Sequence, residues 1–228
     1  MCGRFAVTTD PARLAAELDA VDETGIPHAA PNYNVAPSAD IAAVLAEDGR
    51  RLRLMRWGIT PQWAKEGFRP LINARAETLT TSPAFRSAAK RRRCLVPMDG
   101  YYEWKPNPDE PKRGRKTPYY FYRPDGAPLL VAGLWETSES ALSCTVVTTD
   151  AVGDLAVVHN RMPLILREGD WDRWLDPAEP APADLLAAPP DVGAIAMREV
   201  STLVNRVANN GPELIEPVDG GNQPVGLF

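Results

Sequence analysis

The stretch RCLVPMDGYYEW, residues 93–104, decides the fold because it contains two strand-like runs in direct succession, 93–98 and 100–104. Asp48-Gly49 and Asp125-Gly126 are turn signals typical of β-hairpins, and apolar runs flank both of them. Further strand-like runs lie at 41–46, 52–57, 118–123, 128–135 and 143–149. The sequence therefore predicts a chain of many short strands.

Short helical patterns lie between these strands. Asp10-Pro11 is a good helix start, and Leu14, Leu18 and Val21 give that helix an apolar face. Further short helices are predicted from Ser82-Pro83 to about Lys90, near 151–158 and near 169–175. Neither a βαβ repeat nor a Gly-rich phosphate loop is visible. Together these elements predict an α+β single domain over 1–228, with a twisted, barrel-like, mostly antiparallel β core and short flanking helices.

Four segments are predicted to lie outside regular structure. Residues 22–40 form an irregular loop, and 58–72 form a long structured loop of a length that tends to be functional. The polar, proline-rich interval 105–117 is predicted to be an exposed hairpin loop. The Ala/Pro-rich stretch 177–190 is predicted to be a surface excursion.

The composition of the chain limits which binding partners and which cellular compartment we expect for the protein. A net charge of −5 excludes a protein coated in positive charge, so any nucleic-acid contact must come from a local basic patch. No apolar stretch approaches the ~18 residues of a membrane span, and no signal peptide is evident, so we expect a cytoplasmic protein with no membrane contact. The three cysteines lack metal-ligand spacing, which predicts no metal site and fits a reducing compartment. Cys94 and Cys144 lie in strand-like runs and are predicted to be buried core thiols.

Cys2 directly follows Met1 and is the most informative candidate residue. If methionine aminopeptidase removes Met1, the chain begins with a cysteine whose α-amine and thiol are carried on adjacent carbons. The amine of such a 1,2-aminothiol condenses with an aldehyde, and the sulfur then closes a thiazolidine ring on the imine. The alternative is a chance cysteine near a frayed terminus. Taken alone, Cys2 leaves both interpretations open.

Three other residue types are suited to acid–base or hydrogen-bonding chemistry. His159 is a candidate acid or base, because histidine as a residue type can gain or lose a proton near neutral pH, but its local pattern favours a hydrogen-bonded histidine at the end of an element. Glu103 lies among aromatic residues and would have a raised pKa if it were buried, although it could equally point outward on an alternating strand. Asn73 follows an apolar pair, and a turn or cap is the commoner use of asparagine.

Arginine and tryptophan side chains are candidates for DNA contact. Arg75 would share a face with Asn73 if that segment is extended. The basic run 90–93 fits either a favourable last turn of a helix or a phosphate-facing surface. Trp57 is predicted to belong to the core, whereas Trp63 fits the core and a base-stacking platform about equally well.

Taken in order, these segments resemble the SRAP (SOS response-associated peptidase) family over residues 1 to about 217. No single motif is decisive, but their occurrence in the family's order is strongly specific. The motifs are Met1-Cys2-Gly3-Arg4-Phe5, Tyr33-Asn34-Val35-Ala36-Pro37, Trp57-Gly58, Asn73-Ala74-Arg75-Ala76-Glu77-Thr78, Gly100-Tyr101-Tyr102-Glu103-Trp104, His159-Asn160-Arg161-Met162-Pro163, and Val200-Ser201 with Val204-Asn205.

The resemblance implies a protein that senses abasic sites in single-stranded DNA and caps them covalently, without a cofactor. It maps the catalytic residues onto Cys2, Asn73, Glu103 and His159, and the phosphate-binding arginines onto Arg4, Arg75 and Arg161. Pro37 and Trp63 complete the implied DNA-binding set. The family's loop before the asparagine motif tends to be more aromatic, whereas this stretch offers only Trp63 and Phe68.

The resemblance also leaves two other functions open. Cys2 would act as the nucleophile of a thiol peptidase that releases its own preceding residue, or it would be structural in a non-covalent single-stranded DNA-binding module. The resemblance further implies that the protein associates with the nucleoid when it is bound to damaged DNA.

Overall fold

The protein has an α+β fold with two β-sheets, seen in a computed structural model that describes residues 2–107, 109, 115–138, 141–187 and 192–218. The strands in these residues are β1 (Phe5–Val7), β2 (Ala20–Asp22), β3 (Asn32–Val35), β4 (Asp40–Ala46), β5 (Arg50–Trp57), β6 (Asn73–Arg75), β7 (Arg93–Met98), β8 (Gly100–Lys105), β9 (Thr117–Tyr122), β10 (Leu129–Ser138), β11 (Ala141–Asp150), β12 (Arg161–Pro163) and β13 (Ala196–Glu199). The α-helices are α1 (Pro11–Glu17), α2 (Arg86–Arg91), α3 (Trp171–Leu175) and α4 (Ala183–Ala187). Single-turn helices include η1 (Ala76–Thr78), η2 (Gly153–Val157) and η4 (Thr202–Asn205).

Five strands of the larger sheet close into a barrel. Its order is β11-β10-β7-β4-β5, and β5 returns to pair in parallel with β11 through Cys144 and Trp57. The other barrel pairings are antiparallel, and β2, β6 and β12 extend the sheet at its margins. The predicted barrel-like, mostly antiparallel core is therefore confirmed. In the β4–β5 hairpin, Asp48 and Gly49 take positive φ angles of 50° and 100°, as the Asp-Gly signal predicts.

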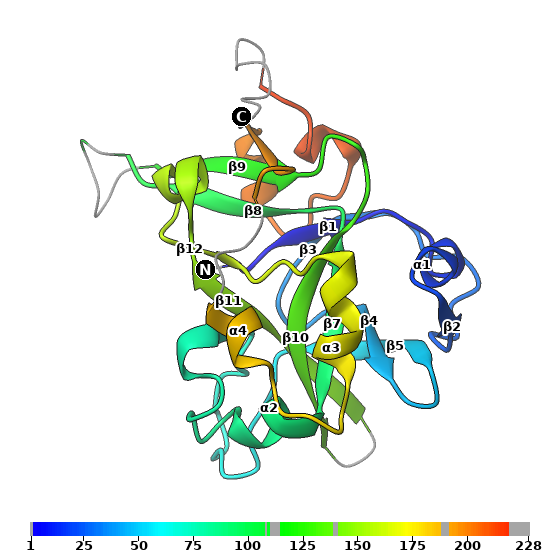
Figure 1. Cartoon of the computed structure of the whole chain (residues 1–228). Helices are drawn as coiled ribbons and strands as arrows, with labels where there is room; N and C mark the ends of the chain where they lie inside the picture. The colour runs from blue at the N-terminus through cyan, green and yellow to red at the C-terminus, as the bar shows by residue number, and fades with distance from the viewer. Residues whose placement is uncertain (1, 108, 110–114, 139–140, 188–191, 219–228) are drawn as a thin grey trace.

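The second sheet is wholly antiparallel and has the strand order β13-β9-β8-β1-β3. Figure 1 shows β8 and β9 lying above the barrel strands. Gly100 at the start of β8 permits the close approach of β9, because a Cβ there would lie 2.4 Å from the carbonyl oxygen of Phe121 on β9. Since β1 pairs with both β8 and β3, the first residues of the chain are held inside the fold.

Successive side chains along the barrel strands point alternately into two different apolar clusters. Val96, Val131 and Val146 belong to the cluster that also contains Phe5 and Phe121, so this set fills the barrel and its upper end. Leu95 and Leu130 belong to the other cluster, where α1, α2, α3 and α4 cover the outer face. Cys94 and Cys144 are fully buried, as predicted.

Three predictions about local structure were wrong. The first helix ends at Glu17, because Asp19 adopts a left-handed φ of 49° and the chain then enters β2, where Val21 is exposed. Residues 22–40 are not wholly irregular, since they contain β3, which is stabilised by its pairing with β1. The second helix begins at Arg86 rather than near Ser82.

The Ala/Pro-rich stretch 177–190 is only partly a surface excursion. Ala181 and Leu185 are buried in the outer apolar cluster, and the Ala181 N–H donates to the Ala89 carbonyl at 3.0 Å. The predicted loop 105–117 connects β8 to β9, but 108 and 110–114 lie outside the described residues, as do 188–190. No helix among the described residues is long and apolar enough to span a membrane.

Candidate functional site

Cys2 lies three residues before the first residue of β1, Phe5, and is completely buried. Burial removes the thiol from water and raises its pKa, and the nearby charge of Glu103 raises it further. The thiol is therefore held in its neutral form. A nucleophilic role for this sulfur requires a group that accepts its proton during the reaction.

Asn73 joins the eight-stranded sheet to the N-terminal residues. It begins β6, which pairs in parallel with β11 through Val146. Its side-chain Nδ2 donates a 2.8 Å hydrogen bond to the Cys2 carbonyl oxygen. Its Oδ1 atom is buried and has no hydrogen-bond partner among the described residues, so the amide holds Cys2 with one end and retains an acceptor at the other.

Glu103 and His159 form an acid–histidine pair beside Cys2. Glu103 lies on β8 with only 4% of its surface exposed, so the outward orientation that the sequence left open is excluded. Its Oε1 lies 4.0 Å from His159 Nδ1, which is within ion-pair distance but beyond hydrogen-bond distance. His159 Nδ1 lies 3.0 Å from the backbone nitrogen of Arg161 and 3.2 Å from its carbonyl oxygen, so the backbone of Arg161 fixes the orientation of the ring.

The four predicted catalytic residues therefore meet although they come from four segments. Glu103 lies on β8 of the five-stranded sheet, and Cys2 precedes β1 of the same sheet. Asn73 begins β6, which pairs with β11, and His159 precedes β12 of the eight-stranded sheet. The site is formed at the junction of the two sheets. It combines the Cys2 thiol, an amide, a buried carboxylate and an imidazole.

Arg4 is held by a polar cluster on the other side of β1. Its Nη1 donates to Asn34 Oδ1 at 2.6 Å and to the Val204 carbonyl at 2.9 Å, and its guanidinium lies 5.9 Å from the Trp104 ring centroid. Asn34 in turn donates to the carbonyls of Val204, Arg206 and Asn209. Arg4 is thus partly occupied by protein groups, and the partial burial of its guanidinium lowers its pKa.

Arg161 is bound almost entirely by protein groups. Its side chain is 8% exposed and forms a bidentate ion pair with Glu77, with contacts of 2.6 and 2.9 Å. It also donates to Asp150 Oδ1 at 2.7 Å and to the Thr148 carbonyl at 2.6 Å. These contacts leave little of the guanidinium exposed, and they hold the residue whose backbone bonds to the His159 ring.

The remaining predicted DNA-contact residues are exposed. Arg75 on β6 and Pro37 after β3 both lie at the surface. Trp63 is 58% exposed and makes an edge-to-face contact with Phe68, with ring centroids 5.6 Å apart. The core alternative for Trp63 is therefore excluded, whereas Trp57 is fully buried as predicted.

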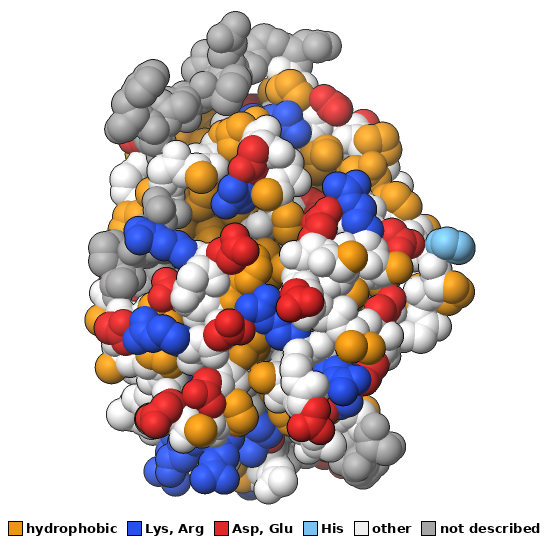
Figure 2. Space-filling view, turned by 45° about the vertical axis from the view of Figure 1, so that its right-hand side comes forward, with side chains coloured by type: hydrophobic (Ala, Val, Ile, Leu, Met, Phe, Trp, Pro, Cys, Tyr) orange, Lys and Arg blue, Asp and Glu red, His pale blue; other side chains and the backbone are white. Residues whose placement is uncertain are grey.

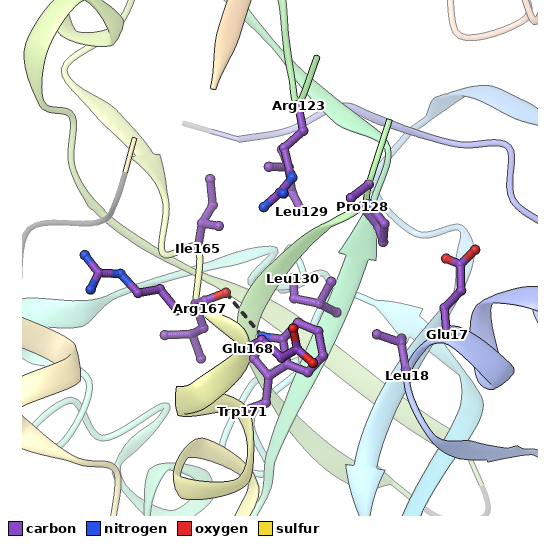
Figure 3. Close-up of a pocket in the computed structure, with 12 residues that line it drawn as sticks. Glu17, Leu18, Arg123, Pro128, Leu129, Leu130, Ile165, Arg167, Glu168 and Trp171 are labelled. Atoms are coloured by element: carbon purple, nitrogen blue, oxygen red, sulfur yellow. Dashed lines mark hydrogen bonds between the residues drawn. The ribbon is translucent and has the colours of Figure 1, made fainter. Parts of the chain in front are cut away.

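The rest of the surface contributes little to this site. Figure 2 shows acidic and basic side chains interspersed on one face, without a continuous basic coat. A hollow of about 260 Å³ lies elsewhere, with Leu129, Leu130 and Ile165 among its apolar lining and Arg123 and Arg167 at its margin (Figure 3). None of the predicted site residues lines it. Within the described ranges, no group of three or more His, Cys, Asp or Glu side chains has the arrangement of a metal site.

Three contributors to the site were missed by sequence reasoning. Glu77 and Asn34 were quoted only as parts of motifs, and their partners lie 84 and 170 residues away along the chain. Tyr101 lies two residues before Glu103, and the two-residue alternation of a strand places both on one face of β8. That alternation is the one sequence signal that identifies any of the three.

Fold and site together define a barrel protein with a buried cysteine, Cys2, beside an acid–histidine pair. The profile of the SOS response associated peptidase (SRAP) family matches residues 1–207, so the chain belongs to the SRAP family. The predicted family resemblance is therefore confirmed.

Characterised relatives cover nearly the whole chain. The abasic site processing protein YoqW of Bacillus subtilis is 37% identical over 229 residues, covering 95% of this chain and 99% of that protein. YedK of Escherichia coli, another abasic site processing protein, is 34% identical and covers 96% of this chain and 100% of that protein. HMCES of Gallus gallus, which carries the same description, is 30% identical and covers 97% of this chain and 79% of that protein.

Solved structures share the fold. A Bacteroides thetaiotaomicron protein superposes with a TM-score of 0.79 at 23% identity, covering 95% of this chain and 99% of that chain. A phage-related protein of Bordetella bronchiseptica has a TM-score of 0.71 at 29% identity, covering 87% of this chain and 94% of that chain.

Proposed function

We propose that this protein recognises abasic sites in single-stranded DNA and caps them through a thiazolidine formed by the amine and thiol of Cys2. The observation that carries the proposal is the 2.8 Å hydrogen bond from Asn73 to the Cys2 carbonyl, made beside the Glu103–His159 pair. It holds the N-terminal residue within reach of acid–base groups. The abasic site processing described for the relatives supports the same substrate.

The first step is condensation of the Cys2 α-amine with the aldehyde of the ring-opened abasic sugar, with loss of water. The amine must be free, so Met1 has to be removed beforehand. An α-amine pKa of about 7.7–8.0 leaves roughly a tenth to a fifth of the amine neutral at pH 7, which is enough for imine formation. No cofactor is required by this chemistry.

Glu103, His159 and Asn73 have separate roles in the proposal. Glu103 is buried beside the thiol and transfers protons during imine formation. His159, whose ring is oriented by the backbone of Arg161, promotes opening of the sugar and, in the reverse direction, reversal of the crosslink. Asn73 keeps Cys2 in place and offers its Oδ1 atom to a sugar hydroxyl or to the ring.

Selection of single-stranded DNA comes from a local surface rather than from the net charge. Arg75, Pro37 and Trp63 are exposed, and an arginine beside a stacking aromatic ring is the usual way to bind a single strand without reading its sequence. Arg4 contributes its charge from the edge of the site. We further propose that the protein is cytoplasmic and joins the nucleoid when it is bound to damaged DNA.

One experiment separates the crosslink from the two other functions. Met1-free protein, checked by intact mass, is mixed with single-stranded DNA that carries one abasic site, and the product is run on a denaturing gel after heating. We expect a shifted band that is absent with Cys2→Ala and with protein that retains Met1. Loss of the band in wild type would overturn the proposal. Peptide turnover by wild type would favour the peptidase, and a shift seen only in native gels would favour a non-covalent binding module.

A further inference from the structure

The phenolic hydroxyl of Tyr101 is a buried polar group that the proposed chemistry does not yet use. Tyr101 is 1% exposed, and its hydroxyl oxygen has no hydrogen-bond partner among the described residues. Leaving a buried hydroxyl without a partner costs stability, so unpaired groups of this kind in a folded protein call for an explanation.

The strand register places Tyr101 near both Glu103 and the segment that carries Cys2. Tyr101 and Glu103 share one face of β8. Tyr101 also lies opposite Phe5 on β1, and Phe5 is three residues after Cys2. Cys2, Phe5 and Tyr101 belong to one apolar cluster. Tyr101 is therefore built into the same end of the barrel as the reacting residue.

The Tyr101 ring is also fixed in orientation. It stacks on Phe121 with the ring centroids 4.7 Å apart and an interplanar angle of 7°. Phe121 fills its half of this stack without a hydroxyl, which shows that packing alone does not require one at Tyr101. The stability of the core would be served equally well by phenylalanine.

The electrostatics of the hydroxyl suit a hydrogen-bond donor. Burial raises the pKa of Tyr101 well above its ordinary value, and the nearby Cys2 and Glu103 raise it further. The phenol therefore keeps its proton throughout the pH range in which the protein works. A group that stays protonated beside a sulfur that must lose its proton can donate to that sulfur without being consumed.

We infer that Tyr101 donates a hydrogen bond to the Cys2 sulfur while the thiazolidine ring closes, and this inference rests on the proposed crosslinking function. In this step the thiol S–H bond breaks and a bond forms from sulfur to the imine carbon. The C=N π pair becomes an N–H bond with the thiol proton, which passes through the Glu103 carboxylate. No oxidant or cofactor is required. Tyr101 stabilises the developing negative charge on sulfur and returns unchanged.

The test separates imine formation from ring closure. Met1-free wild type and Tyr101→Phe are mixed with abasic single-stranded DNA. Borohydride trapping at short times measures the imine, and the heat-stable product formed without borohydride measures the closed ring. For Tyr101→Phe we expect an unchanged rate of imine trapping, ring closure slower by about tenfold, and a Tm equal to or above that of wild type.

Tyr102→Phe is the matched control, because its hydroxyl does have a partner. Tyr102 donates to the Tyr33 carbonyl at 2.7 Å and lies on the opposite face of β8. We expect this variant to lower the Tm and to leave the ratio of closure to trapping unchanged. Equal closure rates in wild type and Tyr101→Phe would overturn the inference, as would a fall in both steps together with the Tm. A wild type that forms no crosslink would instead remove the proposed function itself.

Discussion

The side-chain amide of Asn73 donates to the backbone carbonyl of Cys2 at 2.8 Å, and this bond joins the sheet margin at β6 to the beginning of the chain. Residues at a terminus are usually poorly ordered unless something holds them. Here β1 is paired on both sides, and Asn73 holds the residue that precedes Gly3. Cys2 is therefore held in place by a specific hydrogen bond in addition to the pairing of the strand that follows it.

Asn73→Asp removes the donor of this hydrogen bond with almost no change of shape. We expect the free energy of unfolding to fall by about 1 kcal/mol, because the carbonyl loses its partner and faces a carboxylate. Crosslinking to abasic single-stranded DNA should slow by about tenfold or more, because the amine is no longer held in one position. Urea unfolding and a timed denaturing gel measure the two effects.

Asn107→Asp is the matched control for that substitution. The Asn107 side chain acts as an acceptor for the Asp109 N–H at 3.1 Å, and aspartate preserves this role. We expect wild-type stability and crosslinking for the control. If Asn73→Asp crosslinked at the wild-type rate, the positioning role of Asn73 would be wrong.

Glu77→Gln tests whether the bidentate ion pair between Glu77 and Arg161 positions His159. Arg161 is nearly buried, so weakening its bidentate pair should lower the free energy of unfolding by about 1–2 kcal/mol near neutral pH. The hydrogen bond from Arg161 holds the pKa of Glu77 below its ordinary value. The stabilisation is therefore present above that ordinary value and is lost as the pH falls through the lowered pKa, so the two proteins should converge in acid.

Asp184→Asn provides the comparison for an exposed ion pair. Asp184 pairs with Arg173 at 2.9 Å, but both side chains are more than half exposed, at 64% and 52%. We expect a change within about 0.5 kcal/mol for this control, because water screens such pairs. The His159 ring nitrogen shifts in NMR should move in Glu77→Gln and stay constant in the control. Unchanged stability and unchanged shifts in Glu77→Gln would show that this ion pair does not position His159.

The parts of the fold that the sequence predicts are those that local chemistry determines. The β4–β5 hairpin follows from two apolar runs and an Asp-Gly turn, and β7 and β8 follow from continuous apolar and aromatic runs. β3 was not predictable, because Asn32–Val35 has little strand character and depends on pairing with β1. Val21 continues a helical spacing, but its segment pairs in parallel with β5 instead.

The candidate site also has a part that the sequence predicts and a part that only the folded structure reveals. Motifs identify Cys2, Asn73, Glu103 and His159 by residue type, because their chemistry is carried by single side chains. The partners of Arg161 cannot be read from spacing, since Glu77 is 84 residues away and only the closed barrel brings the two together. The same holds for the unpaired Tyr101 hydroxyl, which is recognised only after every surrounding atom has been placed.

Trp63→Ala tests the exposed aromatic side chain that is proposed to stack on DNA bases. Because Trp63 is 58% exposed, its loss should change the free energy of unfolding by less than about 0.5 kcal/mol. Loss of base stacking should weaken binding to single-stranded DNA by about 1–3 kcal/mol, measured by fluorescence anisotropy at one fixed salt concentration. Val21→Ala removes an apolar side chain that is 54% exposed on β2 and should leave the affinity unchanged. An equal affinity for DNA in wild type and Trp63→Ala would contradict the stacking role.

The pH dependence of thiol reactivity tests the buried state of Cys2 before any DNA is present. Cys2, Cys94 and Cys144 are all free and fully buried, and burial raises the pKa of each thiol. In the folded protein the thiols should stay neutral, so the rate of alkylation by iodoacetamide should be slow and nearly constant between about pH 7 and pH 9. In unfolded protein the rate should rise steeply towards the ordinary cysteine pKa of about 8.5.

The same pKa shift sets the pH dependence of stability. The folded protein keeps thiol protons that the unfolded chain loses, so the free energy of unfolding should fall as the pH rises past about 8.5. Intact mass after alkylation counts the modified thiols, and Cys94→Ala with Cys144→Ala leaves Cys2 as the only thiol to follow. Rapid alkylation of Cys2 in that folded variant, rising with pH as in the unfolded chain, would show that the thiol is open to solvent and would remove the need for Glu103 to take its proton.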